Sequence, residues 1–235
     1  MIYSDDAKFQ DDLPSNQVDQ SANASKIQRR RFVSAAGLAV SGVALTTMFD
    51  KPAQAFHKTP RSLKNQLVSV QRHENDHVAF LLKVLGTKAR PAPTFKNLRA
   101  SNPNKFLELS RVFENVGVGA YLGATPIIFN RGVLAAAGSI ATIEARHAGF
   151  FNALLRNDIT ENAFGAEQSF ERPFKIEEVV TFVSPYLASL NGGPPLSFET
   201  APDKQNDAND IAILNFALVL EYLEAEFYNL NVPRL

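Results

Sequence analysis

The stretch LVSVQRHENDHVAFLLKVL, residues 67–85, has the spacing of an amphipathic helix with two ionisable groups on its apolar face. Steps of three or four residues along it give a face that is aliphatic except for Glu74 and His77. At about 100° and 1.5 Å per residue, this i, i+3 pair puts a carboxylate and an imidazole on one side, about one turn apart. A buried carboxylate costs several kcal/mol unless it is paired or bound to a metal, so this face predicts a polar site inside a helical core.

A second stretch, AGSIATIEARHAGFFNALL at residues 137–155, repeats the arrangement. The same stepping gives a face of alanines, Ile140, Phe151 and Leu155 around Glu144 and His147. One such pair arises often by chance on a solvated helix. Two pairs, each centred in an apolar stripe, indicate that both bind the same partner.

Two further predicted helices each supply one inward-facing glutamate. Residues 211–220 are almost entirely apolar and are followed by Glu221. Glu114 lies on a face with Leu107, Val118 and Tyr121, although Glu108 is a competing carboxylate on this helix. The set is therefore two single glutamates and two Glu-x-x-His pairs, which is the ligand set of ferritin-like di-iron and di-manganese carboxylate proteins.

The chain has 235 residues and no cysteine, so any metal must be held by oxygen and nitrogen ligands, which suit iron or manganese. We expect Glu114 and Glu221 to bind one metal each and Glu74 and Glu144 to bridge the two metals. The two histidines would complete opposite metals. Four carboxylates balance two divalent cations in charge. The 24 basic and 24 acidic residues give no support to nucleic-acid binding.

The pattern predicts an all-α chain. We expect helices from Thr59–Ser62 to Leu85, from near Asn104 to before Pro126, from Val133 to Leu155, from Ile176 to Leu187, and from Asp207 to Asn229. No segment alternates strongly enough to predict a strand. Four long amphipathic helices are most simply packed as a four-helix bundle, with residues 157–206 as a linker that contains the short helix.

The first 55 residues predict an export signal with a polar leader. Arg29, Arg30, Arg31 and Phe32 form a twin-arginine core, a weakly hydrophobic run follows to Phe49, and Ala53-Gln54-Ala55 is a peptidase site. This segment resembles a bacterial twin-arginine (Tat) signal, which implies export to the periplasm or the extracellular space. The mature domain would then be 56–235. An uncleaved anchor is the alternative.

Three segments resemble the ferritin-like family that includes plant desiccation-related proteins and many exported bacterial homologues. They are ILNFAL with LEYLEAEFY at 213–218 and 220–228, GAYLGA at 119–124, and IEARHA at 143–148. The resemblance covers most of 62–235. It implies a ferritin-like four-helix bundle and maps the family's metal positions onto Glu74, His77, Glu114, Glu144, His147 and Glu221.

One departure from this family is large, because its usual first helix is here placed last. Circular permutation is one explanation, since the connection at 157–206 is long enough to return the last helix to its slot. Exchange of this helix with a neighbouring subunit, as in a helix-swapped dimer, and truncation of a second domain are two others. Truncation would leave a three-helix bundle with one open face.

We expect an exported protein in which bound iron or manganese is oxidised by dioxygen or peroxide, as a ferroxidase or a peroxide scavenger. A metal-free structural protein that protects the cell under stress, such as desiccation, is the alternative. Iron storage in a homo-oligomeric cage is a weaker third. The metal, the substrate and any enzymatic activity stay open at the level of sequence.

Overall fold

The computed structural model describes residues 62–235, and the predicted export signal and cleavage site lie outside them. The helices are α2 (Leu63–Leu85), α3 (Pro103–Ala124), α4 (Arg131–Leu154), α5 (Ile176–Val183) and α6 (Asp207–Asn231). Short 3-10 turns follow at Gly86–Lys88, Thr125–Ile127, Pro202–Lys204 and Val232–Arg234. The all-α prediction is confirmed. In the described part of the chain, no helix is long and apolar enough to cross a membrane.

Polar side chains cap the N-terminal ends of all four long helices. Ser62 accepts a hydrogen bond from the Asn65 amide, and Asn102, Asn130 and Asn206 accept equivalent bonds in α3, α4 and α6. Such caps satisfy amides that have no partner within the helix. At the other end of α2, Gly86 has a φ of 53°, which glycine adopts readily. The sequence predicted the ends of the four long helices to within a few residues, but the short helix ends at Val183 and not at Leu187, which begins a strand.

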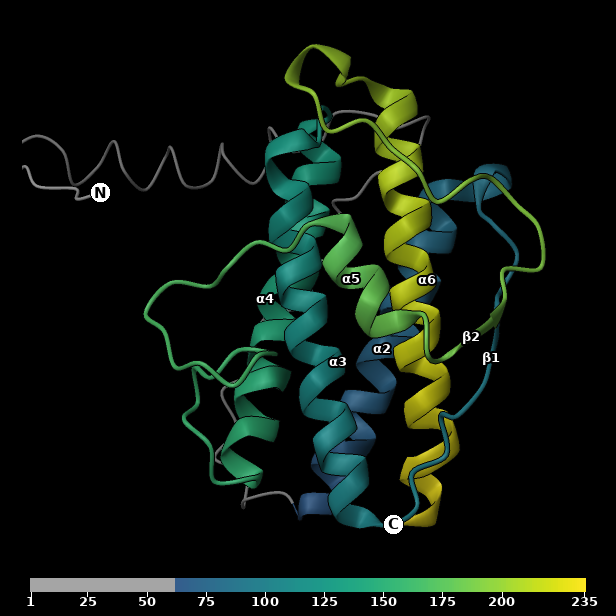
Figure 1. The fold of residues 1–235 in the computed structure, drawn as a ribbon. Coiled ribbons are helices and arrows are strands. Elements are labelled where there is room, and N and C mark those ends of the chain that lie inside the picture. Colours follow the sequence, from purple (N-terminus) through teal and green to yellow (C-terminus); the bar gives the residue numbers. More distant parts are fainter. Residues whose placement is uncertain (1–61) are drawn as a thin grey trace, which may run out of the picture.

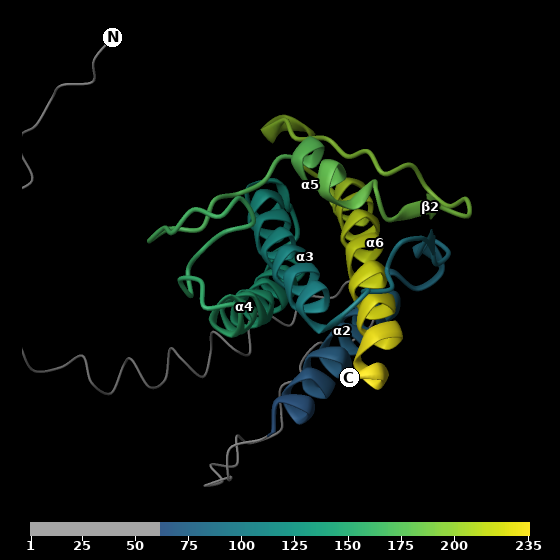
Figure 2. The same cartoon turned by 60° about the horizontal axis from the view of Figure 1, so that its bottom comes forward.

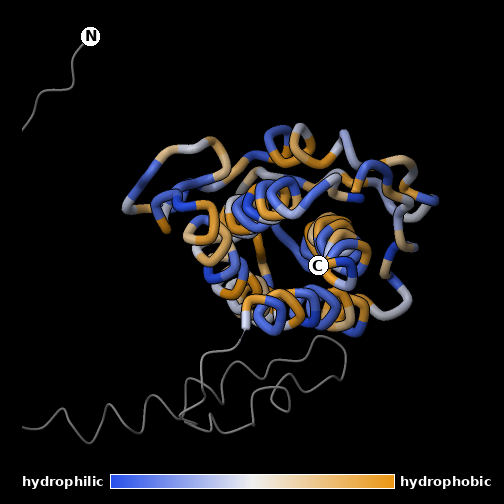
Figure 3. The backbone as a smooth tube through the Cα atoms, turned by 90° about the horizontal axis from the view of Figure 1, so that it is seen from below, coloured by the Kyte–Doolittle hydropathy of each residue, from blue (hydrophilic) through white to orange (hydrophobic). Residues whose placement is uncertain are grey.

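The four long helices form one bundle of two antiparallel pairs. Helix α3 packs beside α4, and α2 packs beside α6. As the colours of Figure 1 show, α2 and α3 run in one direction and α4 and α6 run in the other. Seen end on, the helices surround a common axis (Figure 3). The fold is thus the predicted four-helix bundle with α6 in the fourth position.

Hydrogen bonds from buried side chains hold α6 against the loops of its own chain. Asn215 Oδ1 accepts a bond of 2.8 Å from the Arg90 amide, and Asn231 Oδ1 accepts one of 2.9 Å from the Ala100 amide. The Asp210 carboxylate accepts from two amides of the turn between α3 and α4. The last helix therefore packs within its own chain, and neither exchange between subunits nor a three-helix bundle with an open face describes this structure.

Two long connections, 86–102 and 155–206, run outside the bundle and meet in a small sheet. Strands β1 (Thr94–Phe95) and β2 (Leu187–Ser189) pair antiparallel, with Thr94 opposite Ser189. The expectation of no strands is wrong at this point, because strands of two and three residues are too short to show a period. Helix α5, in the second connection, lies across α3 and α6 (Figures 1 and 2).

The core consists of two hydrophobic clusters. One contains Val70, Phe106, Phe151 and Phe227, and the other contains Leu81, Tyr121, Ile140 and Leu218 among their members. Each long helix contributes to both clusters, and it carries a buried glutamate near the point where one cluster gives way to the other.

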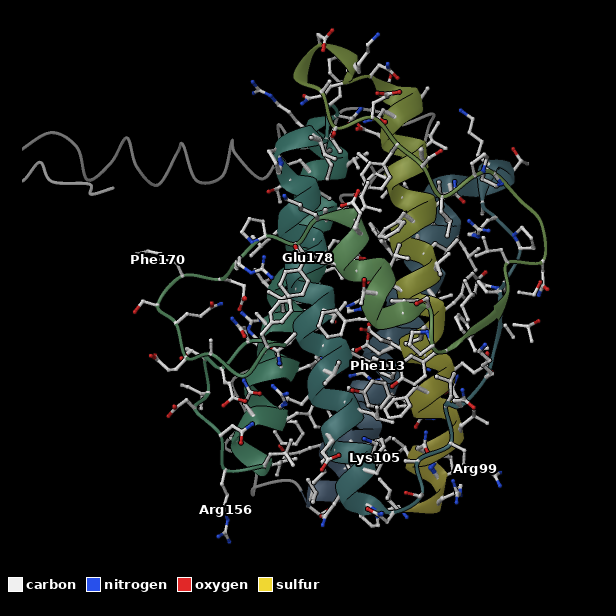
Figure 4. All side chains as sticks on the ribbon, viewed as in Figure 1. Arg99, Lys105, Phe113, Arg156, Phe170 and Glu178 are labelled. Atoms are coloured by element: carbon white, nitrogen blue, oxygen red, sulfur yellow. The ribbon has the colours of Figure 1, made fainter. Side chains whose placement is uncertain are left out.

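A buried polar layer thus divides the core about halfway along the bundle. Phe113, at the border of α3 and α6, belongs to the first cluster (Figure 4). It packs edge-on against Phe227.

Candidate metal centre

All six residues that the sequence singled out meet in this polar layer. The glutamates are almost fully buried, with exposures of 0% for Glu74, Glu114 and Glu144 and 1% for Glu221. The side chain of His147 is 8% exposed and that of His77 is 12% exposed. Each of the four helices supplies at least one of the six.

The side chains form two groups of four, and in each group one ligand atom per residue lies within 4.8 Å of the others. One group is Glu74, Glu114, Glu144 and His147; the other is Glu74, His77, Glu144 and Glu221. The groups share the two glutamates of the Glu-x-x-His pairs. This is the arrangement expected of two metal ions with Glu74 and Glu144 as bridges.

Several carboxylate oxygens converge on single ring nitrogens. His77 Nδ1 lies 3.1 Å from Glu74 Oε2, 3.1 Å from Glu144 Oε1 and 3.2 Å from Glu221 Oε2. His147 Nδ1 lies 3.0 Å from both Glu74 Oε1 and Glu114 Oε2. A ring nitrogen carries at most one hydrogen and donates mainly to one acceptor. Hydrogen bonding alone therefore does not satisfy these oxygens.

Within the polar layer of the described residues, the buried oxygens that are left without a hydrogen bond belong to the two shared glutamates. They are Glu74 Oε1 and both oxygens of Glu144. Buried polar atoms are nearly always satisfied in proteins, so these atoms call for a partner of another kind. Oxygen donors with one imidazole per group suit iron or manganese, and the residues present fit a pair of such cations.

The pKa values reflect crowding of negative charge away from water. Burial, reinforced by the neighbouring carboxylates, raises the pKa of Glu144 well above its usual value. Burial alone would lower the pKa of His147, but the carboxylates of Glu114 and Glu74 outweigh it and raise that pKa to about 11. Contacts with Glu144, Glu221 and Glu74 likewise outweigh burial at His77 and raise its pKa. Without cations, protons on these groups balance the charge.

Two buried tyrosines hold the two unshared glutamates. The Tyr121 hydroxyl donates to Glu221 Oε1 at 2.5 Å, and the Tyr228 hydroxyl donates to Glu114 Oε1 at 2.5 Å. Both rings also pack in the hydrophobic core. Each bond leaves the second carboxylate oxygen, Oε2, directed at a histidine.

His73 lies directly outside the cluster. Its Nδ1 is 2.9 Å from His147 Nε2, and the two rings are parallel, with centroids 5.2 Å apart. A histidine that binds metal through one nitrogen is usually oriented by a hydrogen bond at its other nitrogen. His73 Nδ1 is the group in contact with that other nitrogen, and Arg72 Nη2 lies 3.1 Å from His73 Nε2.

One further carboxylate that the sequence did not single out, that of Glu224 on α6, also lies in the polar layer. The residue is only 3% exposed, and burial and the charge of Glu114 raise its pKa well above the usual value. The missing side chain of Gly117 provides the space: a Cβ there would lie 3.0 Å from Glu144 Oε2 and 3.4 Å from Glu224 Oε1. The i+3 spacing from Glu221 was the available signal.

Two other charged residues of α3, Glu108 and Arg111, do not enter the polar layer. Glu108 is exposed and pairs with Lys105 at 3.2 Å. Arg111 Nη1 points away from the cluster, to Glu161 Oε1 at 3.2 Å and to the Asn162 carbonyl at 3.0 Å. Glu114 is therefore the carboxylate that α3 contributes.

Comparison with known proteins gives one match. A family model described as a ferritin-like domain matches residues 19–157, which is more than half of the chain. The matched range includes α2, α3 and α4 and ends before α5 and α6. No curated protein and no solved structure matches the chain.

Proposed function

Because the chain belongs to the ferritin-like domain family, we propose that it binds a dinuclear iron or manganese centre through six side chains. The ligands are Glu74, His77, Glu114, Glu144, His147 and Glu221. The observation that supports this most strongly is the pair of four-residue groups that share Glu74 and Glu144. The reaction we propose is oxidation of the bound metal by dioxygen or peroxide, as in a ferroxidase or a peroxide scavenger.

The contacts indicate the role of each ligand. Glu74 and Glu144 belong to both groups and act as bridges, while Glu114 and Glu221 each serve one metal. Tyr228 and Tyr121 fix those two unshared carboxylates through their hydroxyl groups. Two redox-active metals bound here would supply electrons to dioxygen or peroxide. The surrounding apolar core limits the access of water to the site.

Metal content tests the proposal. Protein purified without chelator should contain about two iron or manganese atoms per chain, because the family site is dinuclear. The double variant Glu74→Ala/Glu144→Ala should lose both, since it removes both bridges. Glu226→Ala is the matched control, because Glu226 is an exposed glutamate of the same helix, five residues after Glu221.

Mass spectrometry of the metals and circular dichroism should be measured on all three proteins. A folded double variant that keeps full metal content would refute the site. A Glu74→Gln/Glu144→Gln variant covers the case in which the alanine variant does not fold, because it preserves the shape of both side chains.

We further propose that the chain is a circularly permuted relative of the desiccation-related type. In support, α6 lies antiparallel to α2 and completes the bundle from the fourth position, while the connection 155–206 returns the chain to it. A permutant that begins with residues 207–235, joined by a flexible linker to residue 62, should keep the fold and the metal content. Failure of this permutant to fold would count against the idea.

Export through the Tat pathway is a separate proposal that rests on residues 1–55. Arg29→Lys/Arg30→Lys should leave the protein in the cytoplasm, because paired arginines are the feature that identifies such signals. Arg31→Lys is the control and should not change localisation. Equal secretion of all three proteins would exclude this route.

A metal-free stress-protective protein is the second candidate function. It is favoured by the contacts of the two histidines, which can carry positive charge and neutralise part of the cluster. The same measurement separates the candidates. Fewer than about 0.2 metal atoms per chain would favour the metal-free protein over the dinuclear centre.

A further inference from the structure

A cavity of about 530 Å³ opens between α5 and the first half of α6 and extends into the bundle. Its walls come from the second half of α3, the start of α5, the first half of α6 and the segment around Phe198. This volume lies within the ~300–1,000 Å³ typical of small-molecule sites. Figure 1 shows how three helices that supply these walls are arranged, with α5 lying across α3 and α6.

The inner end of the cavity reaches the candidate metal centre. Tyr121 lines the cavity and also donates its hydroxyl hydrogen bond to Glu221. Ala137, another lining residue, is seven residues before Glu144, on the same face of α4. One side chain therefore separates a molecule in the cavity from a predicted metal ligand.

The lining is almost entirely apolar. Most lining residues are alanine, isoleucine, leucine, valine, phenylalanine or proline, and the hydroxyl of the inner tyrosine is already bonded to Glu221. The charged lining residues are Lys175 and Glu177, which are both exposed at the rim and opposite in charge. Water in such a space finds few of the polar partners that ordered water needs, so displacement by an apolar molecule is favourable.

The outer wall is fixed in place. The Phe174 amide donates a 2.8 Å hydrogen bond to the Gly119 carbonyl, which ties the start of α5 to α3. The ring and carbonyl of Phe174 also occupy the space that a Cβ would need at Gly119 and Gly123. The start of α5 is therefore held in a fixed position on α3 and cannot collapse into the cavity.

We propose that the cavity is a binding site for an uncharged, apolar small molecule, held next to Tyr121 with any polar end at the rim. The chemistry of the lining selects an aliphatic chain or a small ring system. The balance of Lys175 and Glu177 at the rim gives no preference for a charged end. The binding proposal rests on the cavity alone. Its relevance to metal chemistry rests on the proposed function.

The test uses the full chain and the neutral fluorescent probe N-phenyl-1-naphthylamine, whose emission rises in apolar surroundings. The chain contains no tryptophan, so its own emission interferes little. Binding should saturate at one probe per chain. 1-Decanol should displace the probe at a lower concentration than decanoate, because only decanoate must bring a charge to the rim.

Ala124→Leu fills the cavity from α3 and should weaken probe binding about tenfold, which corresponds to about 1.4 kcal/mol. Ala141→Leu is the matched control, because Ala141 is also a partly buried helical alanine but does not line the cavity. It should bind the probe as the unaltered protein does. Ala120→Leu is a second cavity variant, needed if Ala124→Leu fails to fold.

Metal content, measured on the same samples, separates this inference from the proposed function. Saturable probe binding by the metal-free Glu74→Gln/Glu144→Gln variant would support the cavity site even without metal. A metal-loaded protein that binds no probe would overturn the inference and leave the metal centre intact. Equal binding by Ala124→Leu and Ala141→Leu would also overturn it, since the probe would then sit elsewhere.

Discussion

His73 Nδ1 and His147 Nε2 lie 2.9 Å apart, with their rings within 2° of parallel. The contact engages the outer nitrogen of His147 and leaves Nδ1 facing Glu74 and Glu114. A residue adjacent to the Glu-x-x-His pair on α2 thus orients the histidine of the pair on α4. The two helices that carry the repeated motif are coupled through this contact.

Replacement of His73 should weaken metal binding at the His147 end of the site. His73→Phe keeps a ring but removes the nitrogen that contacts His147, and loss of such a contact typically costs about 10–100-fold in metal affinity. His73→Gln restores a hydrogen-bonding group and should recover part of the affinity. Competition with a chromogenic chelator measures all three proteins. Wild-type affinity in His73→Phe would show that His147 needs no such partner.

Removal of the tyrosine hydroxyls should free the unshared glutamates. Tyr228→Phe leaves Glu114 without its hydrogen bond and should lower the free energy of unfolding by about 1–3 kcal/mol. Tyr121→Phe should act similarly on Glu221. Both should lose metal affinity, whereas Tyr186→Phe, which alters a ring packed on Phe113, should not. Urea unfolding and metal titration give the two readouts, and unchanged affinity in both variants would refute the positioning role.

Two glycine substitutions should have opposite effects. In Gly117→Ala the new Cβ meets Glu144 Oε2 at 3.0 Å, so the bridging carboxylate must move and metal content should fall. In Gly138→Ala the new Cβ meets no atom within 4 Å, so helix α4 should gain about 0.5–1 kcal/mol. Metal analysis and thermal unfolding check both. Equal metal content in the two variants would mean that Glu144 does not bridge.

Metal binding near pH 7 should release protons. Burial raises the pKa of Glu144 and of Glu224, and carboxylate contacts raise the pKa of His147 to about 11, so the metal-free site holds protons that cations displace. Calorimetric titration in two buffers with different ionisation enthalpies measures the number released. An observed enthalpy that is the same in both buffers would contradict protonation of the metal-free site.

The sequence predicted the long helices well because the signals for each helix lie within its own segment. The apolar stripes, the Ser62 cap and Gly86 are local signals within a few residues of one another. The inward direction of Glu74 and Glu144 followed from the same stripes. The short strands β1 and β2 escaped prediction, because they depend on contacts between two distant connections rather than on a local repeat.

Contacts across helices were harder to predict. Glu224 is buried because Gly117, on another helix, leaves room for it, and nothing near Glu224 in sequence reveals that space. The sequence selected Glu114 over the competing Glu108, and the structure supports this choice, since Glu108 is exposed and pairs with Lys105. The candidate ligands could therefore be predicted from the helix faces. The residues around them could be identified only from the packed bundle.

The placement of α6 beside α2 determines when this protein can begin to function. His77 and Glu221 are separated by 144 positions, so the polar layer closes only after most of the chain has been synthesised. Bundles with such distant contacts fold more slowly than those built from neighbouring hairpins. During translation the apolar face of α2 stays uncovered until α6 has been synthesised. The yield of active protein would therefore depend on chaperones that shield this face.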